Sequence, residues 1–482
     1  MNMEKNTLVQ VQIEDMTEQG EGIGKVDGYT LFIKDTVVGD FVEAKVIKVK
    51  KRYGYGKLLR ILTPSPDRVE PLCPVAGPCG GCQLQAMSYA SQLAFKRRKV
   101  ENHLRRLGGL DVPVEPVLGM EDPWEYRNKC QVPVGRNRDG RIICGFYAGH
   151  THSIIETEHC YLGNEINDQV LRLVKNHMER YGIEPYDEAT GRGLVRHILV
   201  RQGRATGEIM VCLVVNGRRL PHADRLVETL CAIPGMTSIS LNVNRQRNNV
   251  ILGQELINLY GPGHIVDRIG DISYQISPLS FYQVNPVQTE KLYATALDFA
   301  GLTGNETVWD LYCGIGTISL FLAKQAKQVY GVEIVPAAIE NARENAVRNG
   351  IDNAEFFIGR AEEVLPDHYR KVWKETGEKL RADVIVVDPP RKGCDEKLLD
   401  TMLQMQPERI VYVSCDSATL ARDLRVLCGG GYQVKKVQPV DMFPMGVHVE
   451  CIAKIEKKNS GEVLRQLVDQ GFTTSPISDY HY

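Results

Sequence analysis

The stretch TVWDLYCGIGTISLFLAKQA, residues 307–326, decides the fold. An apolar run is followed by a Gly-x-Gly turn and then by a segment of helical length, the order strand, glycine loop, helix. Further strand-like runs follow, separated by helix-like segments such as PAAIENARENAVRNG: these runs are QVYGVEIV, ADVIVVDPPRKG and RIVYVSC. Alternation of this kind is typical of a doubly wound parallel sheet. We therefore predict an α/β domain from about residue 276 to 458.

Ligands of such sheets bind at the carboxyl ends of the strands, so the polar residues at these ends should converge on one edge. These residues are Asp310, Glu333, Asp388 and Cys415.

Dinucleotide dehydrogenases also have a glycine loop after the first strand, with the pattern G-x-G-x-x-G. Here the third glycine of that pattern is missing. Glu333 follows 17 residues after Gly316 and is placed to accept hydrogen bonds from two ribose hydroxyls. An acidic residue at the end of the second strand, together with a glycine loop that lacks part of the pyrophosphate-binding pattern, indicates a binding site for S-adenosylmethionine.

The composition is that of an ordinary globular protein, with 482 residues, 43% hydrophobic and 24% charged. The first residues lack an apolar export segment, and no run of about 18 apolar residues occurs, so we expect a cytoplasmic protein without a membrane partner. The 13 cysteines are then better interpreted as thiols, ligands or nucleophiles than as disulfides. A net charge of −2 argues against wholesale electrostatic binding of nucleic acid but not against local basic patches.

The first 63 residues alternate short strand-like pieces with glycine turns, which predicts a small antiparallel barrel of the oligonucleotide-binding kind. Residues 45–60 carry seven Lys or Arg, no acid, and Tyr53 and Tyr55, the mixture that phosphate contacts and base stacking require. A lysine-guarded edge strand is an equally good interpretation of this segment alone. The proline-rich residues 63–71 predict a domain boundary.

A cysteine motif, CPVAGPCGGCQLQ, opens a central region that we expect to be a mixed α+β domain over residues 64–275. Its thiols, Cys73, Cys79 and Cys82, have C-x5-C-x2-C spacing and need a fourth ligand. Three clustered cysteines with a distant fourth suit a [4Fe-4S] cluster better than zinc. Spacing leaves three candidates for the fourth ligand, namely Cys130, Cys144 and Cys160.

Residues 88–109 predict a basic helix that ends at a glycine, a second possible nucleic-acid contact beside the barrel. Its basic residues are Lys96, Arg97, Arg98, Lys99, Arg105 and Arg106.

Cys415 ends the strand RIVYVSC and precedes the helix-like segment DSATLARDL, which Asp416 or Ser417 would cap. Most intracellular cysteines are small buried hydrophobes. A thiol at a helix N-terminus, however, feels the positive end of the helix dipole, so we expect a lowered pKa and a nucleophilic thiolate.

Taken in order, SPLSFYQVN, DLYCGIGT, VYGVEIV, VVDPPRKG, VSCDSATLARD and GVHVECIAKI resemble the RNA uracil-5-methyltransferase family. The cysteine motif and the N-terminal barrel, which looks like a TRAM domain, resemble the bacterial branch that acts on 23S ribosomal RNA and carries an iron–sulfur cluster. The resemblance covers residues 7–456, and residues 459–482 form a tail of unknown role beyond it. One departure is that many relatives have Asn-Pro where this chain has Asp416 and Ser417.

The resemblance implies a class I S-adenosylmethionine methyltransferase fold and a role for each matching residue. Cys415 would be the nucleophile and Glu450, in the apolar strand VHVECIAKI, a base whose pKa burial raises. The methyl-donor contacts would be Gln283, Tyr312, Gly314, Gly316, Thr317, Glu333 and Asp388. The cluster ligands would be Cys73, Cys79, Cys82 and Cys160.

The function expected from these residues is methylation of uracil C5 in 23S rRNA by a monomer that does not bind DNA. Alternatives are a transfer RNA uridine as substrate, a cytosine-5 methyltransferase, an iron–sulfur electron carrier or radical enzyme, and a non-catalytic RNA-binding protein. The cysteine spacing differs from the C-x3-C-x2-C of radical enzymes. Retention of Cys415, Glu450 and Asp388 together argues against a non-catalytic protein.

Overall fold

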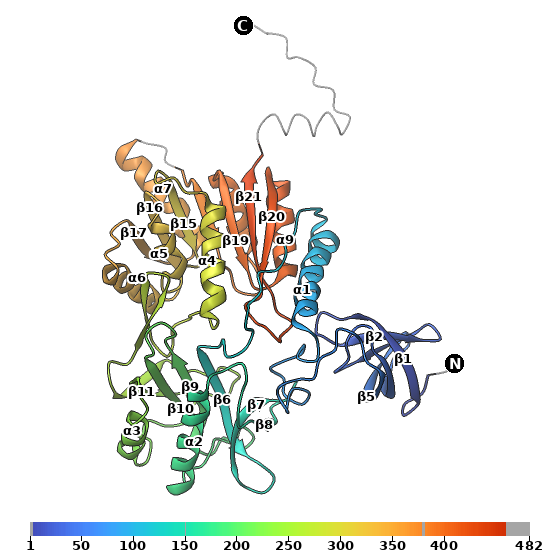
Figure 1. The fold of residues 1–482 in the computed structure, drawn as a ribbon. Helices are drawn as coiled ribbons and strands as arrows, with labels where there is room; N and C mark the ends of the chain where they lie inside the picture. Colours follow the sequence, from blue (N-terminus) through green and yellow to red (C-terminus); the bar gives the residue numbers. More distant parts are fainter. Residues whose placement is uncertain (1–2, 150, 378–380, 459–482) are drawn as a thin grey trace.

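The computed structural model describes residues 3–149, 151–377 and 381–458, so the tail predicted for 459–482 lies outside the described residues. A closed five-stranded barrel forms the N-terminal part, in blue in Figure 1. Its strand order is β1-β2-β3-β5-β4, with the bounds β1 Leu8–Met16, β2 Gly22–Val26, β3 Tyr29–Ile33, β4 Phe41–Val49 and β5 Tyr53–Thr63. Alternate apolar residues such as Val11, Ile13 and Val42 fill its interior.

The predicted barrel is confirmed, but it is not wholly antiparallel, because β3 and β5 pair in parallel. Five strands around a closed ring cannot all alternate in direction, so one neighbouring pair must be parallel. All other pairs in the barrel are antiparallel.

Helix α1, Tyr89–His103, begins at the N-cap Ser88, whose side chain accepts a hydrogen bond from the amide of Ser91. A π-helical turn, η1, extends it over Leu104–Gly108. The chain then leaves the helix at Gly109 with φ of 66°, a left-handed conformation that glycine adopts without strain. The predicted basic helix and its glycine end are thus confirmed. Helix α1 lies beside α9 and β20 of the C-terminal domain.

The central domain, in green in Figure 1, is a seven-stranded sheet of order β12-β11-β10-β9-β6-β7-β8 with two helices packed against it. Strands β9 and β10 are buried along nearly their whole length. The bounds are β6 Lys129–Arg136, β7 Ile142–Tyr147, β8 Ile154–Glu156, α2 Glu165–Arg180, β9 Val195–Gln202, β10 Ile209–Val215, α3 Ala223–Cys231, β11 Met236–Val243 and β12 Glu255–Tyr260.

A two-stranded ribbon, β13 Ile265–Ile269 and β14 Ile272–Ile276, leads into the C-terminal domain, where the predicted doubly wound α/β sheet is confirmed. Its order is β17-β16-β15-β18-β19-β21-β20, and only β21 runs against the direction of the others. The strand bounds are β15 Thr307–Leu311, β16 Gln328–Glu333, β17 Ala354–Ile358, β18 Val384–Val387, β19 Arg409–Ser414, β20 Tyr432–Val440 and β21 Glu450–Lys457.

Two apolar layers enclose this sheet, as expected for strands buried on both faces. Val384 and Val386 of β18 face the layer of helices α4, α5 and α6, while Ile385 and Val387 face α7, α8 and α9 together with α1. The helix bounds are α4 Pro286–Ala300, α5 Thr317–Ala323, α6 Pro336–Arg348, α7 Ala361–Thr376, α8 Glu396–Met405 and α9 Ser417–Gly429. Among the described residues, no helix is long and apolar enough to cross a membrane.

Candidate active site

The glycine loop connects β15 to α5 at the carboxyl edge of the sheet. Tyr312, Gly314 and Gly316 have φ values of 82°, 55° and 82°, which turn the chain sharply before α5 begins at Thr317. A Cβ on Gly316 would lie 3.2 Å from Phe356, whereas a Cβ on Gly314 would meet nothing within 4 Å. Gly316 therefore allows close packing, and Gly314 borders open space.

Three carboxylates stand at this edge, as predicted. Asp310 is buried and accepts a hydrogen bond from Ser319 Oγ at 2.5 Å through Oδ2, while its Oδ1 has no partner among the described residues. Glu333 ends β16 and accepts the amide of Val335 at 3.0 Å. Asp388 follows β18. Burial raises the pKa of Asp310 and Asp388 to about 7, and for Asp388 the charge of Asp310 adds to it. The unpartnered oxygen of Asp310 fits a ligand that carries hydrogen-bond donors and a positive charge.

Tyr293 of α4 lies near these carboxylates, and Gln283 belongs to the segment before α4. Gln283 is 8% exposed, and its carbonyl accepts a hydrogen bond from Asn128 of the central domain at 2.9 Å. Tyr293 is buried; its pKa is raised by burial, and the charges of Asp388, Asp310 and Glu450 raise it further. The sequence analysis missed Tyr293, because a tyrosine within an apolar helix gives no signal of its own.

Cys415 lies between β19 and α9, and Asp416 caps the helix by accepting the amides of Ala418 and Thr419 at 2.9 and 3.1 Å. The prediction of a lowered thiol pKa was wrong: the pKa of Cys415 is raised to about 11. Burial is the largest cause, and the charges of Glu450 and Asp388 add to it, while Arg391 opposes them. Desolvation and two carboxylates thus outweigh the helix dipole, whose first amides the Asp416 carboxylate already satisfies.

The register between β19 and β21 places Glu450 beside Cys415. Ser414 is the antiparallel partner of Cys451, so the first residue of β21 stands beside the residue that follows β19. Glu450 is only 4% exposed, since β21 lies between β19 and β20. Its pKa is raised to about 8, first by burial and then by Asp388, with Arg391 opposing, so the predicted rise is confirmed.

A small cavity of about 60 Å³ adjoins Cys415 and brings together residues from three parts of the chain. Glu18 comes from the loop after β1, Lys99 and His103 from α1, and His448 from the loop before β21. His103 Nε2 lies 2.6 Å from Glu18 Oε1, and its Nδ1 lies 2.8 Å from Ser417 Oγ. The barrel and α1 therefore contribute directly to the surroundings of Cys415.

The predicted basic patch on α1 requires one correction. Lys96 is fully buried and pairs with Asp441 at 2.5 Å, so it is not available to bind RNA. Exposed basic residues of the patch include Arg98, Arg105 and Arg106.

The cysteines of the motif lie near Cys160. The pKa of Cys82 is raised to about 12, chiefly by burial and further by the charges of Cys160, Cys79 and Cys73. Cys130 and Cys144 belong instead to the apolar core of the central domain. Within the described ranges, no group of three or more His, Cys, Asp or Glu side chains is arranged to hold a single metal ion. The four neighbouring thiols have the donor chemistry of an iron–sulfur cluster, whose cage is wider than one ion.

Comparison with known proteins identifies the family. A family model described as tRNA (uracil-5-)-methyltransferase matches residues 222–458, and a TRAM domain model matches residues 4–59. A relative from Halalkalibacterium halodurans, named as an RNA methyltransferase, is 55% identical over 94% of this chain and 98% of its own length. Another from Clostridium tetani, with the same name, is 50% identical over 93% and 96%.

A solved structure is also similar. The tRNA (uracil-54, C5)-methyltransferase of Pyrococcus abyssi, in complex with S-adenosyl-L-homocysteine, has a TM-score of 0.73 and 28% identity and covers 93% of this chain and 100% of that one. The C-terminal domain thus has the class I methyltransferase fold, and the N-terminal barrel is a TRAM domain. The chain belongs to the RNA uracil-5-methyltransferase family and is an S-adenosylmethionine-dependent enzyme of that family.

Proposed function

We propose that this enzyme methylates C5 of a uridine in 23S ribosomal RNA, with Cys415 as nucleophile and Glu450 as base. The observation that carries the proposed chemistry is the pairing of Ser414 with Cys451, since it sets a buried carboxyl beside a thiol at the carboxyl edge of the sheet. Neither group has an ion-pair partner among the described residues, so neither is committed to a structural salt bridge.

The chemistry requires both groups. Uracil C5 is a weak nucleophile, but addition of the Cys415 thiolate to C6 moves an electron pair into the ring and forms an enolate. C5 then takes the methyl group as its bond to the donor sulfur breaks. Glu450 removes the remaining C5 proton, the C5–C6 double bond re-forms, and the Cys415 sulfur leaves. Arg391, which lowers the pKa of both groups, favours their ionised forms.

S-adenosylmethionine would lie at the glycine loop. We assign its contacts to Gln283, Tyr312, Gly314, Gly316, Thr317, Glu333 and Asp388. The open space at Gly314 and the carboxylates at the strand ends support this assignment. Glu333 would accept hydrogen bonds from the ribose, and the carboxylates would favour the positive sulfonium.

We further propose a [4Fe-4S] cluster held by Cys73, Cys79, Cys82 and Cys160. Methyl transfer needs no electrons, so the cluster's contribution would be structural, to fix the 73–82 loop. This loop adjoins the segment before Glu450, because the amides of Gln83 and Leu84 donate to the carbonyl of Met445. Cys79→Ser should lower iron and sulfide content and visible absorbance, whereas Cys231→Ser, in helix α3, should not. An apo protein with normal RNA affinity and stability would contradict the structural role.

The target uridine must be unstacked to reach a site at this depth, so a flipped base or a single-stranded segment is required. Support for 23S rRNA comes from the cysteine motif alone. A transfer RNA uridine is the second candidate, because the similar Pyrococcus abyssi enzyme is named for such a substrate.

The test uses RNA substituted with 5-fluorouridine, incubated with the protein and S-adenosylmethionine and resolved on a denaturing gel. Fluorine at C5 cannot leave as a proton, so a covalent adduct of Cys415 should accumulate and should be missing from Cys415→Ala. Mapping the captured RNA distinguishes 23S rRNA from transfer RNA. If natural RNA gains methyl groups while nothing is trapped, the thiolate mechanism is wrong.

A further inference from the structure

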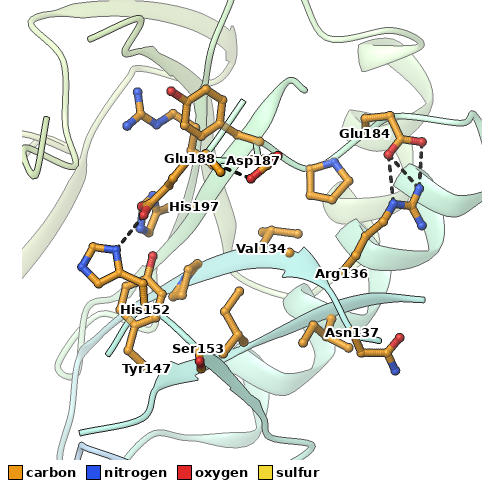
Figure 2. A pocket seen from close by; sticks show the side chains of 18 of the residues that line it. Val134, Arg136, Asn137, Tyr147, His152, Ser153, Glu184, Asp187, Glu188 and His197 are labelled. Atoms are coloured by element: carbon orange, nitrogen blue, oxygen red, sulfur yellow. Dashed lines mark hydrogen bonds and ion pairs between the residues drawn. The ribbon is translucent and has the colours of Figure 1, made fainter. Parts of the chain in front are cut away.

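The central domain contains a large cavity that the proposed mechanism does not use. It has a volume of about 840 Å³ and lies between the β6–β7 hairpin with β8 on one side and residues 184–189 on the other (Figure 2). The first residues of β9, Arg196 and His197, also line it. A volume of this size is in the range of small-molecule sites and accommodates a nucleotide.

Aromatic rings line this cavity. Tyr147 and His152 stack on each other, with ring centroids 5.0 Å apart and planes inclined by 22°. Across the lining, Tyr186 has the Arg196 guanidinium 4.3 Å from its ring centroid. Planar faces of this kind bind nucleobases by stacking, without dependence on sequence.

A buried polar group at the wall of the cavity has no partner. His197 is 6% exposed, and its Nδ1 forms no hydrogen bond among the described residues. Burial and the nearby Arg196 lower its pKa to about 4, so at neutral pH the ring is uncharged and its Nδ1 can accept or donate one hydrogen bond. Arg196 itself is held by the carbonyls of Asn244 and Gln246 at 2.9 and 2.8 Å.

Two of the three acids that line the cavity have basic partners. Glu184 pairs with Arg136 at 2.7 Å and Glu188 with His152 at 2.6 Å, at opposite ends of the cavity in Figure 2. The third, Asp187, accepts hydrogen bonds from the Ala189 amide at 3.0 Å and the Thr190 hydroxyl at 2.7 Å. Arg138, which also lines the cavity, is exposed and forms no ion pair with the described residues. Its guanidinium is therefore available for a phosphate.

We propose that this cavity binds an unpaired nucleotide of the RNA substrate, with the base against Tyr147 and His197 and the adjoining RNA backbone directed toward Arg138. The inference rests on the proposed RNA substrate and adds a second RNA contact, in the central domain. A free mononucleotide has the same chemistry, so the experiment separates the two sources.

The experiment measures RNA affinity of the full-length protein with in vitro transcripts of 23S rRNA and transfer RNA. Tyr147→Ala should weaken binding of the substrate transcript about tenfold, in keeping with one lost base stack. Tyr181→Ala is the matched control, because Tyr181 stacks on His222 in the same domain, at 4.1 Å, outside the cavity. Its affinity should stay within about twofold of wild type.

Arg138→Glu is a second test at an exposed side chain and should also weaken binding of the substrate transcript. Its control is Arg141→Glu, exposed in the same hairpin but outside the cavity lining, which should bind as wild type does. Ultraviolet crosslinking should also attach a nucleotide to a peptide from residues 133–153 or 184–197. The inference is overturned if both cavity variants bind RNA normally and these peptides carry no nucleotide. It is also overturned if mononucleotides at millimolar concentration bind at Tyr147 but the Tyr147→Ala variant binds RNA with wild-type affinity.

The two proposals fail separately. A Cys415 adduct on 5-fluorouridine RNA, together with unchanged binding by the cavity variants, would overturn the second RNA contact and leave the methylation mechanism standing. Crosslinks within the cavity, together with no Cys415 adduct, would support the second RNA contact and overturn the methylation mechanism.

Discussion

Nζ of Lys96 lies 2.5 Å from Oδ1 of Asp441, and both side chains are fully buried. Tyr89 also donates to Asp441 at 2.9 Å, and Lys96 donates to the carbonyl of Phe443 at 3.0 Å. These bonds join α1, which follows the cysteine motif, to the segment that leads into Glu450. The position of the proposed base is therefore fixed from a helix that lies about 350 residues earlier in the chain.

Lys96→Met should destabilise the protein by about 3–5 kcal/mol, because it leaves the Asp441 carboxylate buried without its counter-charge. Denaturant unfolding measures the change. Lys371→Met is the control: Lys371 and Glu375 form an exposed pair at 4.0 Å on α7, and its loss should cost less than about 0.5 kcal/mol. A similar effect of the two substitutions would mean that the buried pair contributes nothing specific.

Glu450→Gln should trap the enzyme on ordinary RNA. Thiolate addition and methyl transfer can still occur, but the C5 proton then has no base, so turnover should fall by about 10²–10⁴-fold. A methylated covalent adduct should accumulate on a denaturing gel without 5-fluorouridine. Glu456 lies near the C-terminal end of the same strand, so the Glu456→Gln variant should turn over normally. Loss of turnover without any adduct would assign Glu450 to an earlier step.

The rate should rise with pH across the neutral range. Glu450 and Cys415 both act in their deprotonated forms, and their pKa values are raised to about 8 and about 11. Steady-state turnover, which includes removal of the C5 proton by Glu450, should therefore increase from about pH 7 to about pH 9, with an inflection near 8 from Glu450. A rate that falls over this interval would exclude both assignments.

Stability should change with pH in the opposite direction. The pKa of Glu450 rises from 4.5 in its ordinary state to about 8 in the fold, so between these values the folded protein holds a proton that the unfolded chain has released. This proton stabilises the fold at low pH, and its contribution disappears as pH rises through about 8.

Glu450→Gln removes this dependence. Its stability relative to wild type should therefore increase with pH by about 1.4 kcal/mol for each unit between the two pKa values. Denaturant unfolding at about pH 5.5 and about pH 8 measures the difference. A constant difference would show that Glu450 titrates normally. Glu456→Gln again serves as the control.

Local patterns were enough to predict the edge of the sheet where Glu333, Asp388 and Cys415 gather, because parallel strands share their carboxyl ends. They could not predict that Lys96 of a basic helix is buried, since its partner Asp441 lies 345 residues away. The thiol pKa of Cys415 was also misjudged. The helix that follows it is visible in the sequence, but the burial and the Glu450 carboxylate that outweigh the dipole depend on the register of β21 with β19.

The bridge formed by His103 predicts that the TRAM barrel influences the loop of the proposed nucleophile. His103→Ala leaves the hydroxyl of Ser417, which is 2% exposed, without this partner, at a cost of about 1–3 kcal/mol. Amide hydrogen exchange in the first turn of α9 should accelerate, and adduct formation by Cys415 should slow. Glu18→Ala, which removes only the barrel side of the bridge, should give a smaller change in the same direction. Glu43→Ala breaks an ion pair with Arg60 at 3.1 Å within the barrel and should leave α9 unchanged. If amide hydrogen exchange in α9 is the same in His103→Ala, Glu18→Ala and Glu43→Ala, the barrel does not act through His103.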